Sequence, residues 1–147
     1  MPRIERTAEV VWEGNVARGA GTLTAGSSGA FTELPYSVAS RIGSPEGKTS
    51  PEELLAAAHG GCLTMSLASE LTQDGTPPTR LEVSCTIVMD EVDGEGHQIV
   101  GSQVRVRLDV AGADDAALAA AVARADAGCP FSTLLRKAGA SVHVSRD

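Results

Sequence analysis

Residues 50–72 read SPEELLAAAHGGCLTMSLASELT, and this stretch decides the fold. It opens at 50–53 with a serine, a proline and two glutamates, the pattern of a capped helix start. The residues that follow are apolar around most of a helical circumference, which predicts a buried helix over about 51–72. Gly60 and Gly61 each cost about 1 kcal/mol relative to alanine inside a helix, so we expect another backbone to cross closely there.

Alternating apolar residues and turn residues on both sides of this helix predict strands. Before it we expect a hairpin of 4–12 with 16–24, a short strand near 36–39, and a loop over 43–50. After it we expect a long antiparallel hairpin of 81–89 with 104–110, a helix over 114–127 with Gly128 as its C-cap, a short helix from Cys129-Pro130 to Lys137, and a strand over 141–144. The sequence therefore predicts one α+β domain over residues 1–147, with antiparallel sheet wrapped around or packed on the buried helix.

Composition narrows the classes of partner. The formal charge is −7, and Lys and Arg are scattered along the chain without forming a cluster. Both features disfavour nucleic acid and anionic membrane surfaces as partners. Aromatic residues make up only 3% of the chain, so the core must be built from small side chains, and their close packing invites a partner subunit. The chain shows neither a signal segment nor an apolar run of about 18 residues, so we expect a cytoplasmic protein.

The cysteines and histidines limit the kinds of catalytic or metal site that this chain can form. They are Cys62, Cys85, Cys129, His59, His97 and His143. An odd number of cysteines without an export signal disfavours a secreted disulfide framework and leaves a transient catalytic disulfide open. No Cys-x-x-Cys pair occurs and the histidines are far apart in sequence, so we expect neither a metal nor another cofactor.

Each cysteine can be interpreted either as a structural residue or as a reactive one. Cys85 shares a strand face with apolar residues, which predicts an inert core thiol. Cys129 precedes Pro130 at a predicted helix start, where free N–H groups favour a thiolate, although a capping or packing role is equally consistent with that position. Local electrostatics alone rank Cys129 first.

Cys62 lies inside the predicted buried helix, so a cation from another segment would have to stabilise its thiolate. Arg41 is the best local candidate, and a carboxylate in the first helical turn, at Glu52 or Glu53, could orient it. His59 lies one helical turn before Cys62, which raises a Cys/His hydrolase as an alternative. We expect instead a satisfied core histidine, because no orienting third group is visible.

Four segments together resemble the OsmC/Ohr family of organic hydroperoxide reductases, and the likeness spans nearly the whole chain. They are WEGNVARGAGTL at 12–23, PYSVASR at 35–41, TSPEELLAAAHGGCLTMSLA at 49–68 and AGCPFSTLL at 127–135. The resemblance implies that Cys62 is the peroxidatic cysteine, Cys129 the resolving cysteine, Arg41 the cation that stabilises the thiolate, and Glu52 its partner. It is this resemblance that ranks Cys62 above Cys129, and the arginine at position 41 is more similar to the OsmC branch than to the Ohr branch.

The resemblance also implies an assembly and reactants. It implies an intertwined homodimer with two long central helices, a hydroperoxide as substrate, and an external dithiol, such as a lipoyl-type dithiol, as reductant. Phe31, Tyr36 and Phe131 are candidate apolar walls of a substrate pocket, or else ordinary core residues. The alternative is a non-enzymatic redox-sensing or ligand-binding dimer, in which the same cysteines oxidise without turnover.

Overall fold

A computed structural model describes residues 1–147, and the chain divides into two compact units. Unit 1 comprises Met1–Pro51 and unit 2 comprises Glu52–Asp147. Each unit is described by itself. The expectation of one family domain over the whole chain stays a prediction.

Unit 1 is built on a small antiparallel sheet in the order β1-β2-β3. Its elements are β1 (Ala8–Glu13), β2 (Ala20–Ala25), β3 (Leu34–Tyr36) and α1 (Val38–Ile42). The predicted opening hairpin is confirmed, with both strands beginning four residues later than expected. Trp12 and Tyr36 pack together on this sheet with ring centroids 5.6 Å apart.

The short strand expected near 36–39 exists but lies earlier, at β3, because the chain turns into helix α1 directly after Tyr36. Ser37 is the N-cap of α1, and its side chain accepts from the backbone N–H of Ser40 while the Ser40 hydroxyl bonds the Ser37 backbone. This reciprocal capping satisfies orphan donors of the first turn and outweighs the strand preference of the surrounding residues. Arg41 consequently lies in the last turn of α1.

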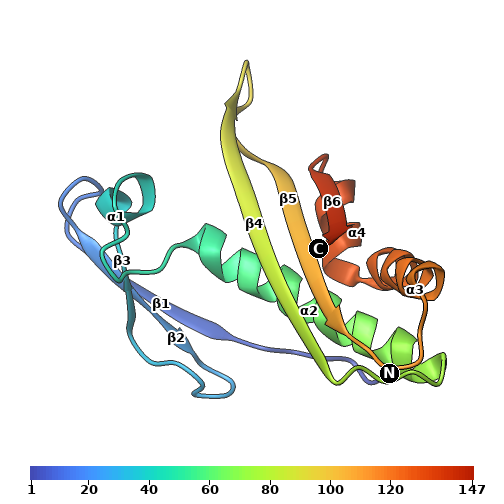
Figure 1. The fold of residues 1–147 in the computed structure, drawn as a ribbon. Coiled ribbons are helices and arrows are strands. Elements are labelled where there is room, and N and C mark those ends of the chain that lie inside the picture. The colour runs from blue at the N-terminus through green and yellow to red at the C-terminus, as the bar shows by residue number, and fades with distance from the viewer. The chain divides into compact units, whose positions relative to one another are not determined.

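Unit 2 holds the long helix and the larger sheet (Figure 1). Its elements are α2 (Pro51–Gln73), β4 (Arg80–Val92), β5 (Gly96–Asp109), α3 (Asp115–Gly128), α4 (Pro130–Lys137) and β6 (Ser141–Arg146). The predicted helix, hairpin and C-terminal elements are confirmed. β4 and β5 pair antiparallel, and β6 adds to β5 in parallel.

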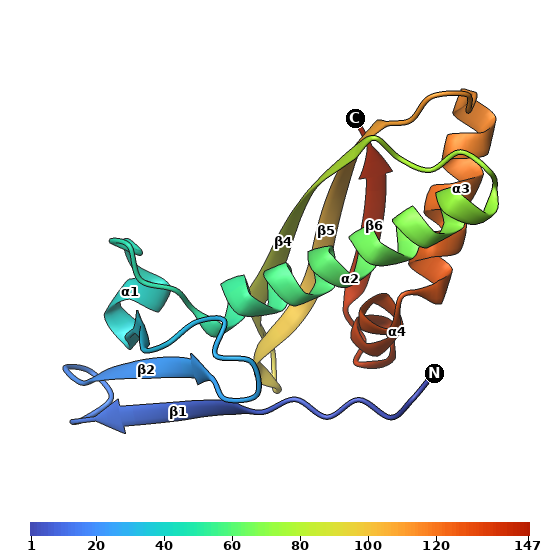
Figure 2. The same cartoon turned by 90° about the horizontal axis from the view of Figure 1, so that it is seen from below.

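Helix α2 crosses one face of the β4-β5-β6 sheet, and α3 lies beside its C-terminal half (Figure 2). The α2 side chains that enter the core come from one stripe at fourfold spacing, namely Leu63, Leu67 and Leu71, each 1% exposed. They pack with buried residues of β5 and α3: Val104, Val106, Ala121, Val122 and Ala125. Residues spaced by four share a helix face, so this stripe seats α2 on the sheet.

The expectation that another chain segment crosses α2 closely is confirmed at Gly60 and wrong at Gly61. A Cβ at Gly60 would lie 3.3 Å from the Cβ of Cys85 on β4, so a strand does cross there. A Cβ at Gly61 would meet nothing within 4 Å, because that position points away from the sheet. The same outward side of α2 carries Met65, which is 71% exposed although it is apolar.

The junction of α3 and α4 also differs from expectation. Gly128 is the last residue of α3 rather than its C-cap, and the C-cap is Cys129 in an extended conformation. Cys129 is at the same time the N-cap of α4, with Pro130 in the first turn. A single residue therefore separates the two helices, which leaves Cys129 in a tight elbow.

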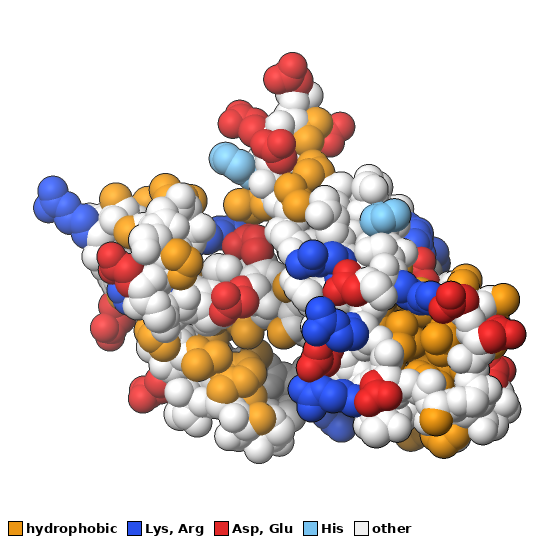
Figure 3. All heavy atoms as spheres, viewed as in Figure 1, with side chains coloured by type: hydrophobic (Ala, Val, Ile, Leu, Met, Phe, Trp, Pro, Cys, Tyr) orange, Lys and Arg blue, Asp and Glu red, His pale blue; other side chains and the backbone are white.

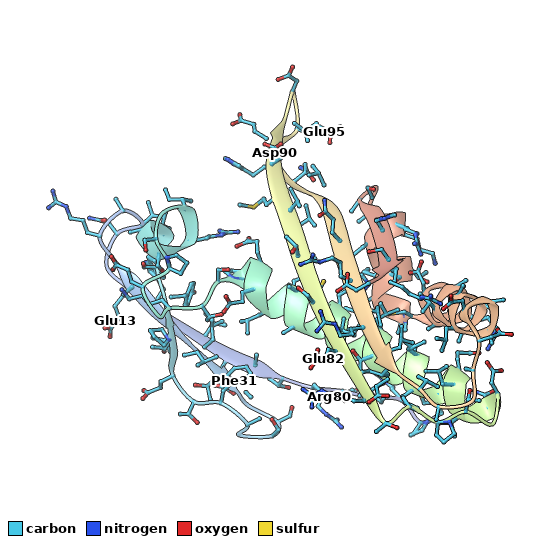
Figure 4. All side chains as sticks on the ribbon, viewed as in Figure 1. Glu13, Phe31, Arg80, Glu82, Asp90 and Glu95 are labelled. Atoms are coloured by element: carbon cyan, nitrogen blue, oxygen red, sulfur yellow. The ribbon has the colours of Figure 1, made fainter.

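Charged side chains gather unevenly on unit 2. The tip of the β4–β5 hairpin carries the exposed residues Asp90, Glu91, Asp93 and Glu95 (Figures 3 and 4).

None of the helices combines the length and the apolar character that a membrane-spanning helix needs.

Candidate active site

Cys62 and Cys129 lie together in unit 2, although 66 residues separate them in sequence. Cys62 comes from the middle of α2, and Cys129 from the elbow between α3 and α4. Cys62 packs against the core cluster that contains Cys129, the Cys129 thiol acts on the pKa of Cys62, and both are free thiols. Cys129 is 0% exposed, whereas Cys62 is half-buried, so Cys62 is the one that a solute can reach.

The start of α4 acts on Cys62. The backbone N–H of Phe131, in the first turn of α4, acts on the Cys62 thiol and lowers its pKa. Free N–H groups at a helix N-terminus stabilise a thiolate. The sequence predicts that this helix start stabilises a thiolate at Cys129. In the structure Cys129 is the N-cap and makes no side-chain capping hydrogen bond.

The resting environment nevertheless favours the neutral thiol. Burial raises the pKa of Cys62, the hydrogen bond with Cys129 raises it further, and the Phe131 N–H only partly opposes them. Burial disfavours the charged form because a low-dielectric surrounding solvates an ion poorly. These surroundings therefore disfavour the Cys62 thiolate, and a positive charge beside it would stabilise it.

His59, one turn before Cys62, is completely buried and hydrogen-bonded at both ring nitrogens. Nδ1 lies 2.7 Å from the Ser102 hydroxyl of β5, and Nε2 lies 2.8 Å from the Ser132 hydroxyl of α4. Both serines are 0% exposed. The expectation of a satisfied core histidine is confirmed. A Cys62/His59 hydrolase is disfavoured, because neither ring nitrogen is available as a base.

Asp126 of α3 closes the elbow around Cys129. Its carboxylate receives two hydrogen bonds from Arg136 of α4, at 3.1 and 2.7 Å, and the Ser132 hydroxyl also stabilises its charge. Although burial acts to raise it, these hydrogen bonds hold the pKa of Asp126 below its ordinary value. Burial likewise lowers the pKa of His59. Asp126 is therefore ionised and His59 neutral at neutral pH.

These protonation states fix the direction of each hydrogen bond. The charge of ionised Asp126 attracts the hydroxyl proton of Ser132, so the Ser132 oxygen accepts from Nε2–H of His59. Nδ1 of His59 then accepts from the Ser102 hydroxyl. The Ser102 oxygen lies 3.4 Å from the Cys85 sulfur and can accept the S–H of Cys85. We call Asp126, Ser132, His59, Ser102 and Cys85 the buried hydrogen-bond chain.

Sequence reasoning missed both serines of this chain. Ser102 shares the inward parity of Val104 and Val106 on β5, and Ser132 lies three residues before the buried Leu135 on α4. A polar residue in an apolar stripe is the signal that would have pointed to them. Cys85 is only half-buried, and it lines a groove of about 400 Å³ together with residues of α2.

The remaining predicted site residues fall in both units. Unit 1 holds Arg41 in α1, Tyr36 in β3 and Phe31 in the preceding loop, where Figure 4 labels it. Unit 2 holds Glu52 in the first turn of α2, and Phe131, which packs against the core. No group of three or more His, Cys, Asp or Glu side chains could hold a metal ion.

Comparison with known proteins settles the family. The family described as OsmC-like protein matches residues 43–145, which include both cysteines of the pair. The chain belongs to the OsmC-like family. It is 33% identical over 133 residues to the peroxiredoxin OsmC of Escherichia coli K12, covering 90% of this chain and 91% of the relative.

Solved structures of the family share the fold. The organic hydroperoxide resistance protein OhrB of Bacillus subtilis is similar with a TM-score of 0.74 at 21% identity, covering 96% of this chain and 98% of that one. An OsmC-like protein of unknown function from Vibrio cholerae is similar with a TM-score of 0.76 at 14% identity, covering 99% of each chain. The α+β architecture expected from the sequence is therefore that of OsmC and Ohr proteins.

Proposed function

We propose that this chain is a thiol-dependent peroxidase that reduces organic hydroperoxides to alcohols. The observation that carries the proposal is the packing of half-buried Cys62 against the core cluster that contains buried Cys129. Family membership supports it, since relatives bear the names peroxiredoxin and organic hydroperoxide resistance protein.

The proposed cycle uses the two thiols in order. The Cys62 thiolate attacks the peroxide O–O bond, forming Cys62 sulfenic acid, and the released alkoxide takes up a proton to become the alcohol. The Cys129 thiol then displaces hydroxide from the sulfenic acid, which leaves as water once the thiol proton is transferred, and a Cys62–Cys129 disulfide results. An external dithiol, of the lipoyl type in our proposal, reduces this disulfide and is itself oxidised.

We assign the missing positive charge to Arg41, with Glu52 as the carboxylate that orients it. The raised pKa of Cys62 supports the need for such a cation. A guanidinium would favour the thiolate and stabilise the charge on the departing alkoxide. Arg41→Lys keeps the charge but loses the planar fork, so we expect turnover to fall by about 10-fold or more. Glu52→Gln should reduce turnover more than Glu53→Gln, and the reverse order would transfer the partner role to Glu53.

We further propose an intertwined homodimer located in the cytoplasm. The outward side of α2, with exposed Met65 and the open position at Gly61, supports a second subunit packing there. Exposed apolar side chains on one side of a helix mark an interaction site. Phe31, Tyr36 and Phe131 are proposed as the apolar walls that accept the organic part of the hydroperoxide.

Steady-state turnover tests the proposal. Cumene hydroperoxide, tert-butyl hydroperoxide and hydrogen peroxide would be compared with dihydrolipoamide as reductant, on wild type and on Cys62→Ser and Cys85→Ser. We expect faster turnover of the organic peroxides, no activity in Cys62→Ser, and little change in Cys85→Ser, which is the matched control. Full activity in Cys62→Ser would refute the proposed role of this cysteine.

A second candidate is a redox-sensing or ligand-binding dimer, favoured by the raised pKa of Cys62. A thiol held neutral reacts slowly and suits stoichiometric oxidation better than rapid turnover. Formation of one disulfide per chain, with no second turnover when dihydrolipoamide is in excess, would select this function instead.

A further inference from the structure

The elbow that carries Cys129 is connected to the Cys62 helix by one buried hydrogen bond. Ser132 lies three residues after Cys129 on α4, and its hydroxyl is 2.8 Å from Nε2 of His59. His59 lies three residues before Cys62 on α2. The bond therefore joins the two helices one turn away from the thiol pair on each side.

Ser132 is itself held from the α3 side of the elbow. Its hydroxyl acts on Asp126 and helps to lower the pKa of that carboxyl, and Arg136 clamps the same carboxylate with two hydrogen bonds. Arg136 also donates to the carbonyl of Val142 on β6, at 3.3 Å. Helix α4 is thus joined to α2 through Ser132 in its first turn, and to α3 and β6 through Arg136 in its last turn.

Two groups at the start of α4 act on Cys62, namely the thiol of the N-cap Cys129 and the Phe131 N–H. We propose that His59 and Ser132 are positioning residues that keep both groups on the Cys62 sulfur, and so set how readily the Cys62–Cys129 disulfide forms. This inference rests on the proposed function. It adds that a histidine without contact to the substrate controls the resolving step, in which a sulfenic acid and a thiol give a disulfide and water.

The chain offers a matched control in Ser102. Ser102 and Ser132 are both 0% exposed, and each hydrogen-bonds one nitrogen of His59. Ser102 belongs to β5, however, and its hydroxyl bonds His59 and Cys85, neither of which belongs to the Cys129 elbow. Replacing either serine by alanine removes one hydroxyl from His59, but only Ser132→Ala removes the hydrogen bond between α4 and α2.

The first measurement needs no peroxide. Reduced wild type, Ser132→Ala and Ser102→Ala would be equilibrated in glutathione redox buffers, and the Cys62–Cys129 disulfide quantified by alkylation and mass spectrometry. Misplacement by about 1 Å can cost about 100-fold in an intramolecular reaction, so we expect Ser132→Ala to lower the equilibrium constant for the disulfide by about 10-fold or more. Ser102→Ala should stay within about twofold of wild type.

The second measurement follows the fate of the sulfenic acid. With excess cumene hydroperoxide, Ser132→Ala should form more Cys62 sulfinic acid than wild type, because slower resolution exposes the sulfenic acid to a second peroxide. Asp126→Asn, which keeps the side-chain volume, should shift both readouts in the same direction and serves if Ser132→Ala does not fold.

Equal shifts in the two serine variants, or no shift in Ser132→Ala, would overturn the inference. If wild type forms the disulfide in redox buffer but does not turn over peroxide, the proposed function fails while the positioning role is still tested. The two failures are therefore distinguishable.

Discussion

His59 should make the stability of the fold depend on pH in a predictable direction. Burial lowers the pKa of His59 in the folded chain, whereas the unfolded imidazole titrates near about 6.5. Below that pH the unfolded chain binds a proton that the folded chain does not, so the free energy of unfolding falls as the pH falls. The stability is fully present above about pH 6.5 and is lost on acidification toward the lowered pKa.

The size of the effect follows from a single proton. One group changes the free energy of unfolding by at most about 1.4 kcal/mol per pH unit. Integrated between about pH 7.5 and 5.5, an imidazole that stays neutral in the folded chain contributes up to about 1.4 kcal/mol. His59→Gln removes the titrating ring while keeping an amide that can donate to Ser132, so this part of the pH dependence should vanish.

Urea unfolding at one protein concentration, at both pH values, measures the difference. His143→Gln is the control, because His143 is exposed and the variant retains His59. We expect it to lose as much stability on acidification as wild type, whereas His59→Gln should lose less by up to about 1.4 kcal/mol. The reasoning is refuted if His59→Gln and wild type show the same loss, or if the NMR signals of His59 titrate normally in the folded protein.

Three further predictions concern packing, the thiol pair and assembly. Leu135→Ala, at a position 5% exposed, should destabilise the fold by about 3 kcal/mol, whereas Leu134→Ala, at a position 59% exposed, should cost under about 1 kcal/mol in urea unfolding; equal losses would contradict the burial of α4. Cys129→Ala removes a hydrogen bond that raises the pKa of Cys62, so the pH midpoint of Cys62 alkylation should move down, and an unchanged midpoint would argue against the contact. Met65→Asp places a charge on the outward side of α2 and should convert the proposed dimer to a monomer in sedimentation velocity; a variant that stays dimeric would place the interface elsewhere.

Most elements of this fold could be predicted from local patterns. The helix over 51–73 and the hairpin of β4 with β5 follow from apolar periodicity and from turn residues, which act over a few positions in sequence. The strand expected near 36–39 already ends at Tyr36, since Ser37 and Ser40 cap a helix more strongly than the pattern favours a strand. The expectation of a close crossing at Gly61 was wrong, because glycines in a helical sequence do not reveal which side of the helix a neighbour approaches.

What the sequence by itself determined is the family and the order of most elements, and it also proposed the pair Cys62 and Cys129, because all three depend on motifs and on local periodicity. What only the tertiary structure decided is the surroundings of those cysteines. The bond from His59 to Ser132 joins residues 73 apart, and that from His59 to Ser102 joins residues 43 apart. A hydrogen bond depends on distance in space to within a few tenths of an ångström, and no pattern along the chain encodes that distance. The Phe131 N–H on Cys62 and the buried hydrogen-bond chain therefore become visible only when α2, β5 and α4 have packed around one core.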